Sequence, residues 1–516
     1  MNTFSPKPPA KEKYYAPTED DAERIEGYTK AEDMLDLSEH ANLFDIQNAD
    51  VKASYIPFDF AGMLNRLMRH YTFGPDFRVR ALNSVKAADK NIARIMDNSD
   101  GVTLFREVAE SLPMYGDAVI RVDLVPPEDV GSDENKMQAL MRYVKPHQAT
   151  VVRDEMDNRK VNQVTLAWLI DPKKAGVQAP QGYKILLREI HEPGTYQFYA
   201  NYYDGEKIGD YISVDLVIPG LPTETQSTGI DEIPLVFIAN NRQAGEFWGR
   251  SEFVRVRPII QALEKRMAQL DEVLEKHARP KLIVGPGTLD EDGRALLDMF
   301  DVIEVEASVM EKAVKPEYLT WDMQIEAIKH QIEKLEEYFF MFTETSPASF
   351  GLERDGSQVE SARALKFKAH RTINKVEDLR DTFGDAVKKL MRIAQKLETR
   401  AGTYKYKVAT VQLIWPDPII EDDTQEALDY SLLKQNQLVS VHRTVKDLFN
   451  LTDEEADIER ARILEDEADF ADAASAGVPA LGFGEPAAPE EVLPEGGEAA
   501  PAAALAEEAE TEAEEA

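Results

Sequence analysis

The sequence predicts a mixed α+β fold, and three observations carry this prediction. Residues 260–277 and 325–342 each carry apolar side chains spaced alternately three and four residues apart, as on one face of a helix. From Ser357 to Leu397 the same helical spacing continues without a proline. Between Met141 and Ile238 the apolar period changes to two, which is typical of antiparallel strands with one buried face. Long helices and a sheet region therefore share the chain.

Composition places the chain among globular proteins. Of its 516 residues, 43% are hydrophobic and 30% are charged, which is enough apolar material for the cores of several domains. No run of 18 apolar residues exists, so no membrane span is expected. The chain has no cysteine, which excludes a disulfide framework, a zinc–thiolate site and a thiol nucleophile.

The formal charge of −36 is uneven along the chain, because Arg462 is the last basic residue and many acids follow it. The rest of the chain is still acidic. Sequence-independent DNA binding comes mainly from Lys and Arg side chains that neutralise phosphates. The charge therefore argues against tight duplex binding, although it is compatible with DNA that passes without being held.

The N-terminal region reads as helical. Residues 19–50 show acidic helical patches, and a helix is expected from Ile56 to Gly74. A further helix is expected from Val102 to Leu112, followed at Gly116 by a turn into a strand.

The period-two region predicts an antiparallel meander. Its expected strands are Met141–Val144, Val161–Ile170, Tyr183–Ile190, Thr195–Tyr203 and Tyr211–Val217. The aromatic residues Tyr196, Phe198, Tyr199, Tyr202 and Tyr203 admit two interpretations, a stacking platform for bases or packing within the sheet. Because no Lys or Arg is interleaved with them, sheet packing is the favoured interpretation.

The two helices with alternating three and four spacing form a hairpin around a short insert. Each carries a narrow apolar stripe, flanked by charged residues such as Glu264 and Lys265. A two-helix hairpin has little core of its own, so the stripe needs cover from the rest of the chain or from another subunit. The expected packing residues are Ile260, Leu263, Met267, Leu270, Leu274, Ile325, Ile328, Ile332, Leu335 and Phe339.

The insert itself is expected to contain strands at 281–284 and 302–305, with a turn at Gly285-Pro-Gly287 and a short helix at 291–299. The glycine turn superficially resembles a dinucleotide-binding loop. That interpretation fails because the third glycine is missing, Pro286 has no N–H donor, and no long βαβ unit follows.

After the hairpin comes a loop, Thr343–Gly356, and then the long helix. Ser357 and Glu360 form a capping-box pattern at its start. A strand is expected from Tyr404 to Trp415, followed by helices at 424–436, 441–449 and 453–469. Residues 470–516 are mostly Ala, Glu, Pro and Gly, a composition that cannot bury a core, so disorder is predicted there.

No catalytic motif is present in the sequence. It contains no Walker A pattern, no His-Glu-x-x-His and no Gly-x-Ser-x-Gly, and its eight histidines are scattered. We therefore predict no catalytic, cofactor-binding or metal-ligating residues, and any energy for moving a substrate must come from a partner.

Four segments carry a family resemblance. They are Ile-Pro-Leu-Val-Phe-Ile-Ala-Asn-Asn-Arg at 233–242, His-Ala-Arg-Pro-Lys-Leu-Ile-Val at 277–284, Glu-Ser-Ala-Arg-Ala-Leu-Lys at 360–366, and Leu-Val-Ser at 438–440. In order and spacing they resemble the portal (head-to-tail connector) proteins of tailed bacteriophages, over roughly residues 50 to 468. Ala362 departs from the family, which often has glycine there.

The resemblance implies a portal-like fold with a wing, a helical stem, an α/β clip, a long spine helix and a helical crown. The implied division is an N-terminal arm at 1–50 that is partly disordered, a wing at 51–250, stem helices at 251–279 and 321–342, a clip at 280–320, a tunnel loop at 343–357, the spine at 358–400, a strand plus crown at 401–469, and an acidic tail at 470–516.

The resemblance also implies a function. Copies of the chain would form a ring, a dodecamer, at one vertex of the capsid in the virion, after assembly in the host cytoplasm. Double-stranded DNA would pass non-specifically through its channel, packaged by the terminase large subunit and later ejected. Further implied partners are the major capsid and scaffolding proteins and the head-completion or tail connector proteins.

Two sets of residues receive roles from this resemblance. The DNA-facing tunnel loop would include Ser349, Phe350, Leu352, Glu353 and Arg354. The clip surface that docks terminase or connector proteins would include Lys281, Asp290, Glu291, Asp292 and Arg294. Two alternatives stay open: a non-portal structural or scaffold protein of the virion, and a phage DNA-processing enzyme, against which the missing catalytic motifs weigh.

Overall fold

The computed structural model of the protein divides into two compact units, Met1–Glu421 and Asp422–Ala516, which are taken separately below. The residues that it describes are 14–44, 55–74, 77–82, 86–131, 136–278, 281–284, 302–304, 317–319, 325–352, 362–400, 402, 404–416, 430–433, 435–436, 438–449, 451, 456–465 and 468.

The first unit begins with helices. They are α1 (Glu19–Asp33), α2 (His40–Leu43), α4 (Phe60–Thr72), α5 (Lys86–Asn98) and α6 (Gly101–Tyr115). Side chains cap two of them: Thr18 accepts from the Asp21 N–H at 3.1 Å, and Asp59 accepts from the Gly62 N–H at 2.9 Å. The predicted helices at 56–74 and 102–112 are confirmed, whereas α5 was not expected. The described part of residues 1–50 packs on the body, since Tyr28, Met34 and Phe44 belong to its main core.

A three-stranded sheet lies at the centre of this unit. Its order is β10 (Leu235–Ala239), β2 (Asp117–Val125) and β3 (Gln138–Val144), all antiparallel. The chain enters β2 from α6 through the turn at Gly116, as predicted. Short 3₁₀ turns, η1 (Pro127–Val130) and η2 (Pro146–Gln148), flank β3.

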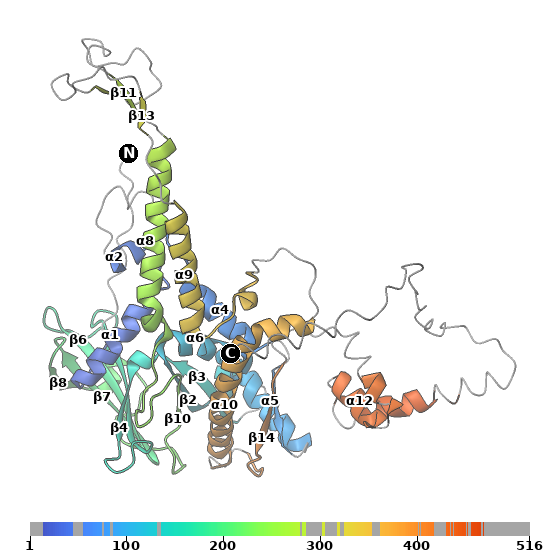
Figure 1. Cartoon of the computed structure of the whole chain (residues 1–516). Helices are drawn as coiled ribbons and strands as arrows, with labels where there is room; N and C mark the ends of the chain where they lie inside the picture. The colour runs from blue at the N-terminus through green and yellow to red at the C-terminus, as the bar shows by residue number, and fades with distance from the viewer. Residues whose placement is uncertain are drawn as a thin grey trace, which may run out of the picture. The chain divides into compact units, whose positions relative to one another are not determined.

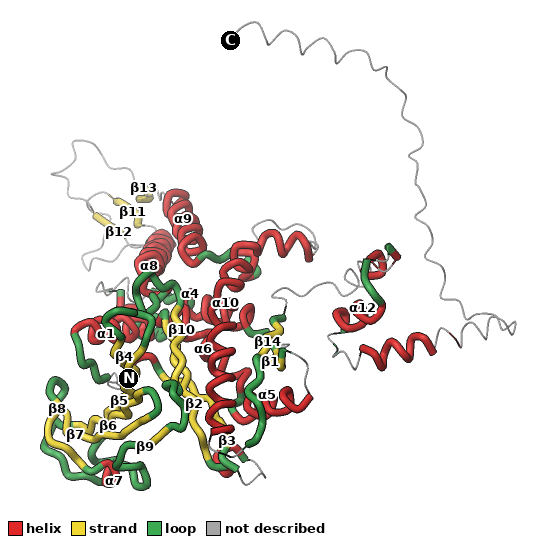
Figure 2. The backbone as a smooth tube through the Cα atoms, turned by 90° about the horizontal axis from the view of Figure 1, so that it is seen from below, coloured by secondary structure: helices red, strands yellow, loops and turns green. Residues whose placement is uncertain are grey.

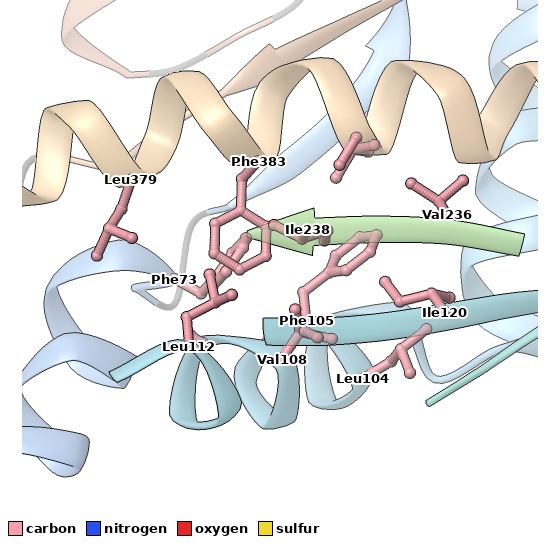
Figure 3. Close-up of a cluster of buried hydrophobic side chains, with 14 of the residues drawn as sticks. Phe73, Leu104, Phe105, Val108, Leu112, Ile120, Val236, Ile238, Leu379 and Phe383 are labelled. Carbon is pink, nitrogen blue, oxygen red and sulfur yellow. The ribbon is translucent and has the colours of Figure 1, made fainter. Parts of the chain in front are cut away.

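Apolar side chains from the central sheet and two helices form the main core. Figure 3 shows Phe105 and Leu112 of α6, Ile238 of β10 and Phe383 of the long helix α10 (Ala362–Arg400) pointing toward one another. All four are buried. The long helix is therefore fixed to the same sheet as the N-terminal helices.

The predicted meander is confirmed as a second sheet. It runs β4 (Ala149–Arg153), β5 (Val161–Ile170), β6 (Lys184–Glu192), β7 (Thr195–Tyr203) and β8 (Ile208–Ile212), with β9 (Gln226–Ser227) paired to β7. The aromatic residues of β7 pack within it, with Phe198 and Tyr203 buried.

Two predictions for this region are wrong. Residues 141–144 do not join the meander, because β3 pairs with β2 instead. The second half of the expected strand 211–217 is a helical turn, α7 (Val214–Val217), whose Val214 and Val217 fill a core under β6 and β7. A short apolar run fits either a strand or a buried helical turn, and the period alone does not separate them.

The hairpin consists of α8 (Glu252–Ala278) and α9 (Ile325–Thr343), which lie side by side in Figures 1 and 2. Between them, β11 (Lys281–Val284) pairs in parallel with β12 (Val302–Glu304) and antiparallel with β13 (Glu317–Leu319). The predicted strands of the insert are confirmed. The expected turn at 285–287 and helix at 291–299 lie outside the described residues.

A short 3₁₀ turn, η4 (Pro347–Phe350), precedes α10, and β14 (Val411–Ile414) follows it. The capping box at Ser357 and Glu360 lies outside the described residues. The strand predicted from Tyr404 is shorter than expected, because its antiparallel partner β1 (Arg78–Ala81) offers four residues for pairing.

The second unit contains α12 (Val441–Leu448), as predicted, and residues 430–433 and 456–465 are also helical. Val445 and Ala456 are buried. The predicted disordered tail, 470–516, lies outside the described residues. Among the described helices, none combines the length and apolarity needed to cross a membrane.

Candidate functional site

The base of the hairpin is rooted in the main core. Ile260 and Leu263 of α8 and Phe339 of α9 are buried, and the Phe339 ring lies 5.1 Å from that of Phe60 on α4. These three predicted packing residues therefore anchor the base of the hairpin in the interior of its own chain.

The rest of the apolar stripe has incomplete cover. Leu274 is 48% exposed, and five further stripe residues are half-buried: Met267, Leu270, Ile328, Ile332 and Leu335. The side chain of Ile325 lies outside the described residues. Since these side chains alternate along two helices, the hairpin presents a continuous, partly open apolar seam.

Glu264, which the sequence placed among the flanking charges, is fully buried. Its Oε1 lies 2.9 Å from His40 Nδ1 and accepts the Phe58 N–H at 2.9 Å, and its Oε2 accepts the Tyr55 hydroxyl. Helix α2 and the segment before α4 cover this face of α8, which no local pattern foretold. Burial lowers the pKa of His40, but the hydrogen bonds to Glu264 and to the Met34 carbonyl outweigh it and raise that pKa overall.

A buried ion pair joins the hairpin to the long helix. Lys375 of α10 pairs with Glu252, the first residue of α8, and donates to the Thr343 carbonyl at the end of α9 at 2.6 Å. The Asn240 side-chain amide donates to Glu252 Oε1 at 2.9 Å. One cation therefore connects both ends of the hairpin, α10 and the segment after β10. We call Glu252, Lys375 and Thr343 the junction cluster.

Sequence reasoning missed the junction cluster, although a signal existed. Lys375 lies three residues after Thr372 and four before Leu379, both on the buried side of α10. A charged residue on that row is expected to be buried with a partner.

The first half of the predicted tunnel loop is fixed to α10. Thr372 Oγ1 accepts the Ser346 N–H at 2.8 Å and lies 2.9 Å from Ser349 Oγ, which donates to it. The Phe350 ring lies 5.6 Å from that of Phe340 on α9. Leu352 is exposed. Glu353 and Arg354 lie outside the described residues, so the structure brings together only the first part of this predicted set.

A cleft of about 500 Å³ opens beside the junction cluster, between β10, the end of α9 and α10. Two of its residues, Asn241 and Glu344, have left-handed backbones with φ of 50° and 56°. Both signs of charge line the cleft: Arg242, Arg255 and Lys389 against Glu344, Asp378 and Asp385. This mixture does not select an anionic or a cationic small molecule.

Most of the predicted clip residues lie outside the described part of the chain. Lys281 begins β11, with its side chain outside the described residues, where Asp290, Glu291, Asp292 and Arg294 also lie. Among the described residues, no group of three or more His, Cys, Asp or Glu is placed to hold a metal ion.

Comparison with known proteins identifies a family to which the sequence is similar and a solved structure with a similar fold. The sequence model of the family described as phage portal protein, SPP1 Gp6-like, matches residues 18–469. No curated protein matches the chain significantly. A solved structure, the neck of a native GTA particle computed with C12 symmetry, is similar with a TM-score of 0.40 and 10% sequence identity, over 75% of this chain and 88% of that chain.

Proposed function

Since the chain belongs to the phage portal protein family, SPP1 Gp6-like, and is thus a head-tail connector, we propose a function for its assembly. Its copies form a ring, and the channel of that ring carries double-stranded DNA. The observation that supports the ring is the hairpin of α8 and α9. Its base is buried in its own chain, while Leu270, Leu274 and Ile332 along its length are half-buried or exposed. Hairpins of neighbouring copies would complete the seam.

In this proposal α8 and α9 are the stem, the β11–β13 insert is the clip, and residues 343–357 are the tunnel loop. The spine is 358–400 and the crown lies within 401–469. A ring of twelve copies at one capsid vertex is the expected assembly. The terminase large subunit would supply the energy for packaging, because the sequence has no Walker A pattern of its own.

The remaining partners follow from the same role. Capsid and scaffolding proteins would surround the ring, and head-completion or tail proteins would dock on the clip, with Lys281, Asp290, Glu291, Asp292 and Arg294 as the proposed contacts. Electron microscopy of the purified assembly distinguishes a portal from a non-portal scaffold protein, because the scaffold protein would lack an axial pore.

The ring is tested by charge placed in the seam. Leu270→Asp or Ile332→Asp introduces a carboxylate that costs several kcal/mol if desolvated between copies. We expect the mass measured by light scattering to fall from ring to monomer. Leu216→Asp, at an exposed position on α7, is the matched control and should keep the ring.

Circular dichroism must show that each variant keeps its helices, so that loss of mass reports association rather than unfolding. A wild-type chain that stays monomeric in every condition, and is monomeric in capsids, would refute the ring.

A further inference from the structure

The first turns of α10 present a polar row of residues on one side of the helix. Positions spaced three and four residues apart lie on the same helical face. The row consists of Lys368, Arg371, Thr372 and Lys375. Farther along the helix, Leu379 and Phe383 belong to the main core instead. Since Thr372 and Lys375 are buried, the start of α10 needs polar partners where the rest of the helix has apolar ones.

The partners of this row are the end of α9 and the loop that follows it. Each member of the row bonds to residues 341–349, by its side chain or its backbone. Apart from those of Thr372, the bonds are Lys375 to the Thr343 carbonyl at 2.6 Å, Arg371 to the Met341 carbonyl at 2.9 Å, and the Ser346 hydroxyl to the Lys368 carbonyl at 2.7 Å. The polar row is therefore the surface on which α10 carries this part of the chain.

Thr372 lies inside the row and makes two of its contacts with one hydroxyl. The residue is fully buried, and its Oγ1 accepts the Ser346 N–H at 2.8 Å and the Ser349 hydroxyl at 2.9 Å. A backbone N–H that loses its acceptor in the interior of a protein is unfavourable. The Thr372 hydroxyl therefore fixes where the chain lies at Ser346 and at Ser349.

The loop segment is itself closed by backbone hydrogen bonds. The Ser349 N–H donates to the Ser346 carbonyl at 3.0 Å, and the Leu352 N–H donates to the Pro347 carbonyl at 3.1 Å. Just before it, Glu344 has a left-handed backbone with φ of 56°, at the point where the chain leaves α9. Leu352 is 51% exposed at the far end of this segment. A side chain that fixes residues 346 and 349 therefore also fixes the exposed end of the segment.

We propose that Thr372 is the positioning residue of the tunnel loop, and that its hydroxyl sets how far residues 349–352 project into the channel. This inference rests on the proposed function, which places the loop at the channel. DNA retained in a full capsid presses on whatever narrows its path, so a narrowing loop must be held by supporting hydrogen bonds. The loop side chains would contact DNA, whereas Thr372, buried on α10, acts through them.

Thr372→Val tests this role, because it keeps the branched shape of the side chain and removes the hydroxyl. In assembled rings, hydrogen exchange of the Ser346 amide should become about tenfold faster. Capsids that contain the variant should still package DNA, but nuclease-protected DNA should then be lost about threefold faster than from the wild type. Thr372→Ser returns the hydroxyl and should restore both values.

The matched control is Thr382→Val on the same helix. Thr382 is exposed, and its hydroxyl donates to the Asp378 carbonyl of its own helix at 3.1 Å. This variant should change neither the exchange of the Ser346 amide nor the retention of DNA. If Thr372→Val fails to form rings, Ser349→Ala decides by the same two measurements, since it removes the second bond to Thr372 at a half-buried site.

The outcomes separate this inference from the proposed function. Faster exchange of the Ser346 amide with normal retention of DNA would show a merely structural role for Thr372 and overturn the inference, while the proposed function stands. Unchanged exchange in Thr372→Val would overturn the contact itself. Wild-type chains that form no ring, or rings that carry no DNA, would refute the proposed function and this inference with it.

Discussion

The ammonium group of Lys375 lies 2.6 Å from the carbonyl oxygen of Thr343 and donates a hydrogen bond to it. Thr343 is the last residue of α9, and the final carbonyls of a helix lack intrahelical partners and carry the negative end of its dipole. Lys375 satisfies this carbonyl and pairs with Glu252 at the start of α8. Helices α8 and α9 are therefore tied to α10 at one point, where the segment that leads from α9 to α10 begins.

Removing this cation should destabilise the chain strongly. Lys375→Met keeps the length of the side chain but leaves Glu252 buried without a counter-charge, and breaking a buried pair in this way costs about 3–5 kcal/mol. Chemical denaturation of the first unit should show that loss. Lys388→Met, at an exposed pair with Asp385 on the same helix, should change the free energy of unfolding by less than about 1 kcal/mol.

A double variant tests the physical cause. Adding Glu252→Gln to Lys375→Met removes the unpaired charge and should restore part of the lost stability. If the double variant is as unstable as Lys375→Met alone, the unpaired carboxylate is not the cause.

Gly116→Ala should be among the most damaging single-methyl changes. Gly116 has φ of 83°, and an added Cβ would lie 2.4 Å from the carbonyl carbon of Arg250. The left-handed backbone alone costs about 1–3 kcal/mol for a residue with a side chain, and the backbone of Arg250 cannot retreat as a flexible side chain could. We expect poor soluble yield or a sharply lower Tm.

The matched control is Gly131→Ala, where φ is 60° and nothing lies within 4 Å of the added carbon. Gly131→Ala should therefore lose only the stability that a left-handed backbone costs a residue with a side chain. Equal Tm values for the two variants would contradict the close approach of Gly116 and Arg250.

The pair of His40 and Glu264 should make stability depend on pH. The pKa of His40 is raised in the folded chain, so folding is favoured by protonated His40. This contribution is fully present below the ordinary histidine value of about 6.5 and is lost as the pH rises through the raised pKa. The Tm difference between the wild type and His40→Gln should therefore shrink as the pH rises.

The exposed His330 of α9 provides the control, since His330→Gln removes a histidine that faces solvent. A Tm difference for His40→Gln that stays constant across the pH series would argue that the His40 side chain acts only by its shape and its neutral hydrogen bonds.

The loop between α9 and α10 should serve DNA rather than assembly. Deleting Ser349 to Arg354 removes the exposed Leu352 but leaves Lys375, Thr343 and the hydrogen bond between Ser346 and Thr372. We expect rings and empty capsids to form while packaging or retention of DNA fails. The measurement is nuclease-protected DNA per capsid, and a normal value would contradict a tunnel role.

Local spacing in the sequence determined the main elements of this protein. The rows of Ile260 to Leu274 and Ile328 to Phe339 specified α8 and α9, and the period of two specified the meander, because side-chain direction along a helix or strand follows from backbone geometry alone. The absence of catalytic motifs and the order of the short family segments pointed to a portal protein. These properties belong to neighbouring residues, so they can be read without the fold.

The tertiary structure decided which charges are buried and which strands share a sheet. Glu264 and Lys375 are both buried because segments distant in sequence cover them. The position of Lys375 on the buried side of α10 indicated that it needs a partner, but the fold decided that this partner is Glu252. Residues 141–144 left the meander because β3 pairs along its whole length with β2, from Val144 opposite Val119 to Gln138 opposite Val125. Coverage and pairing depend on contacts between distant segments, whose energies are absent from any local pattern.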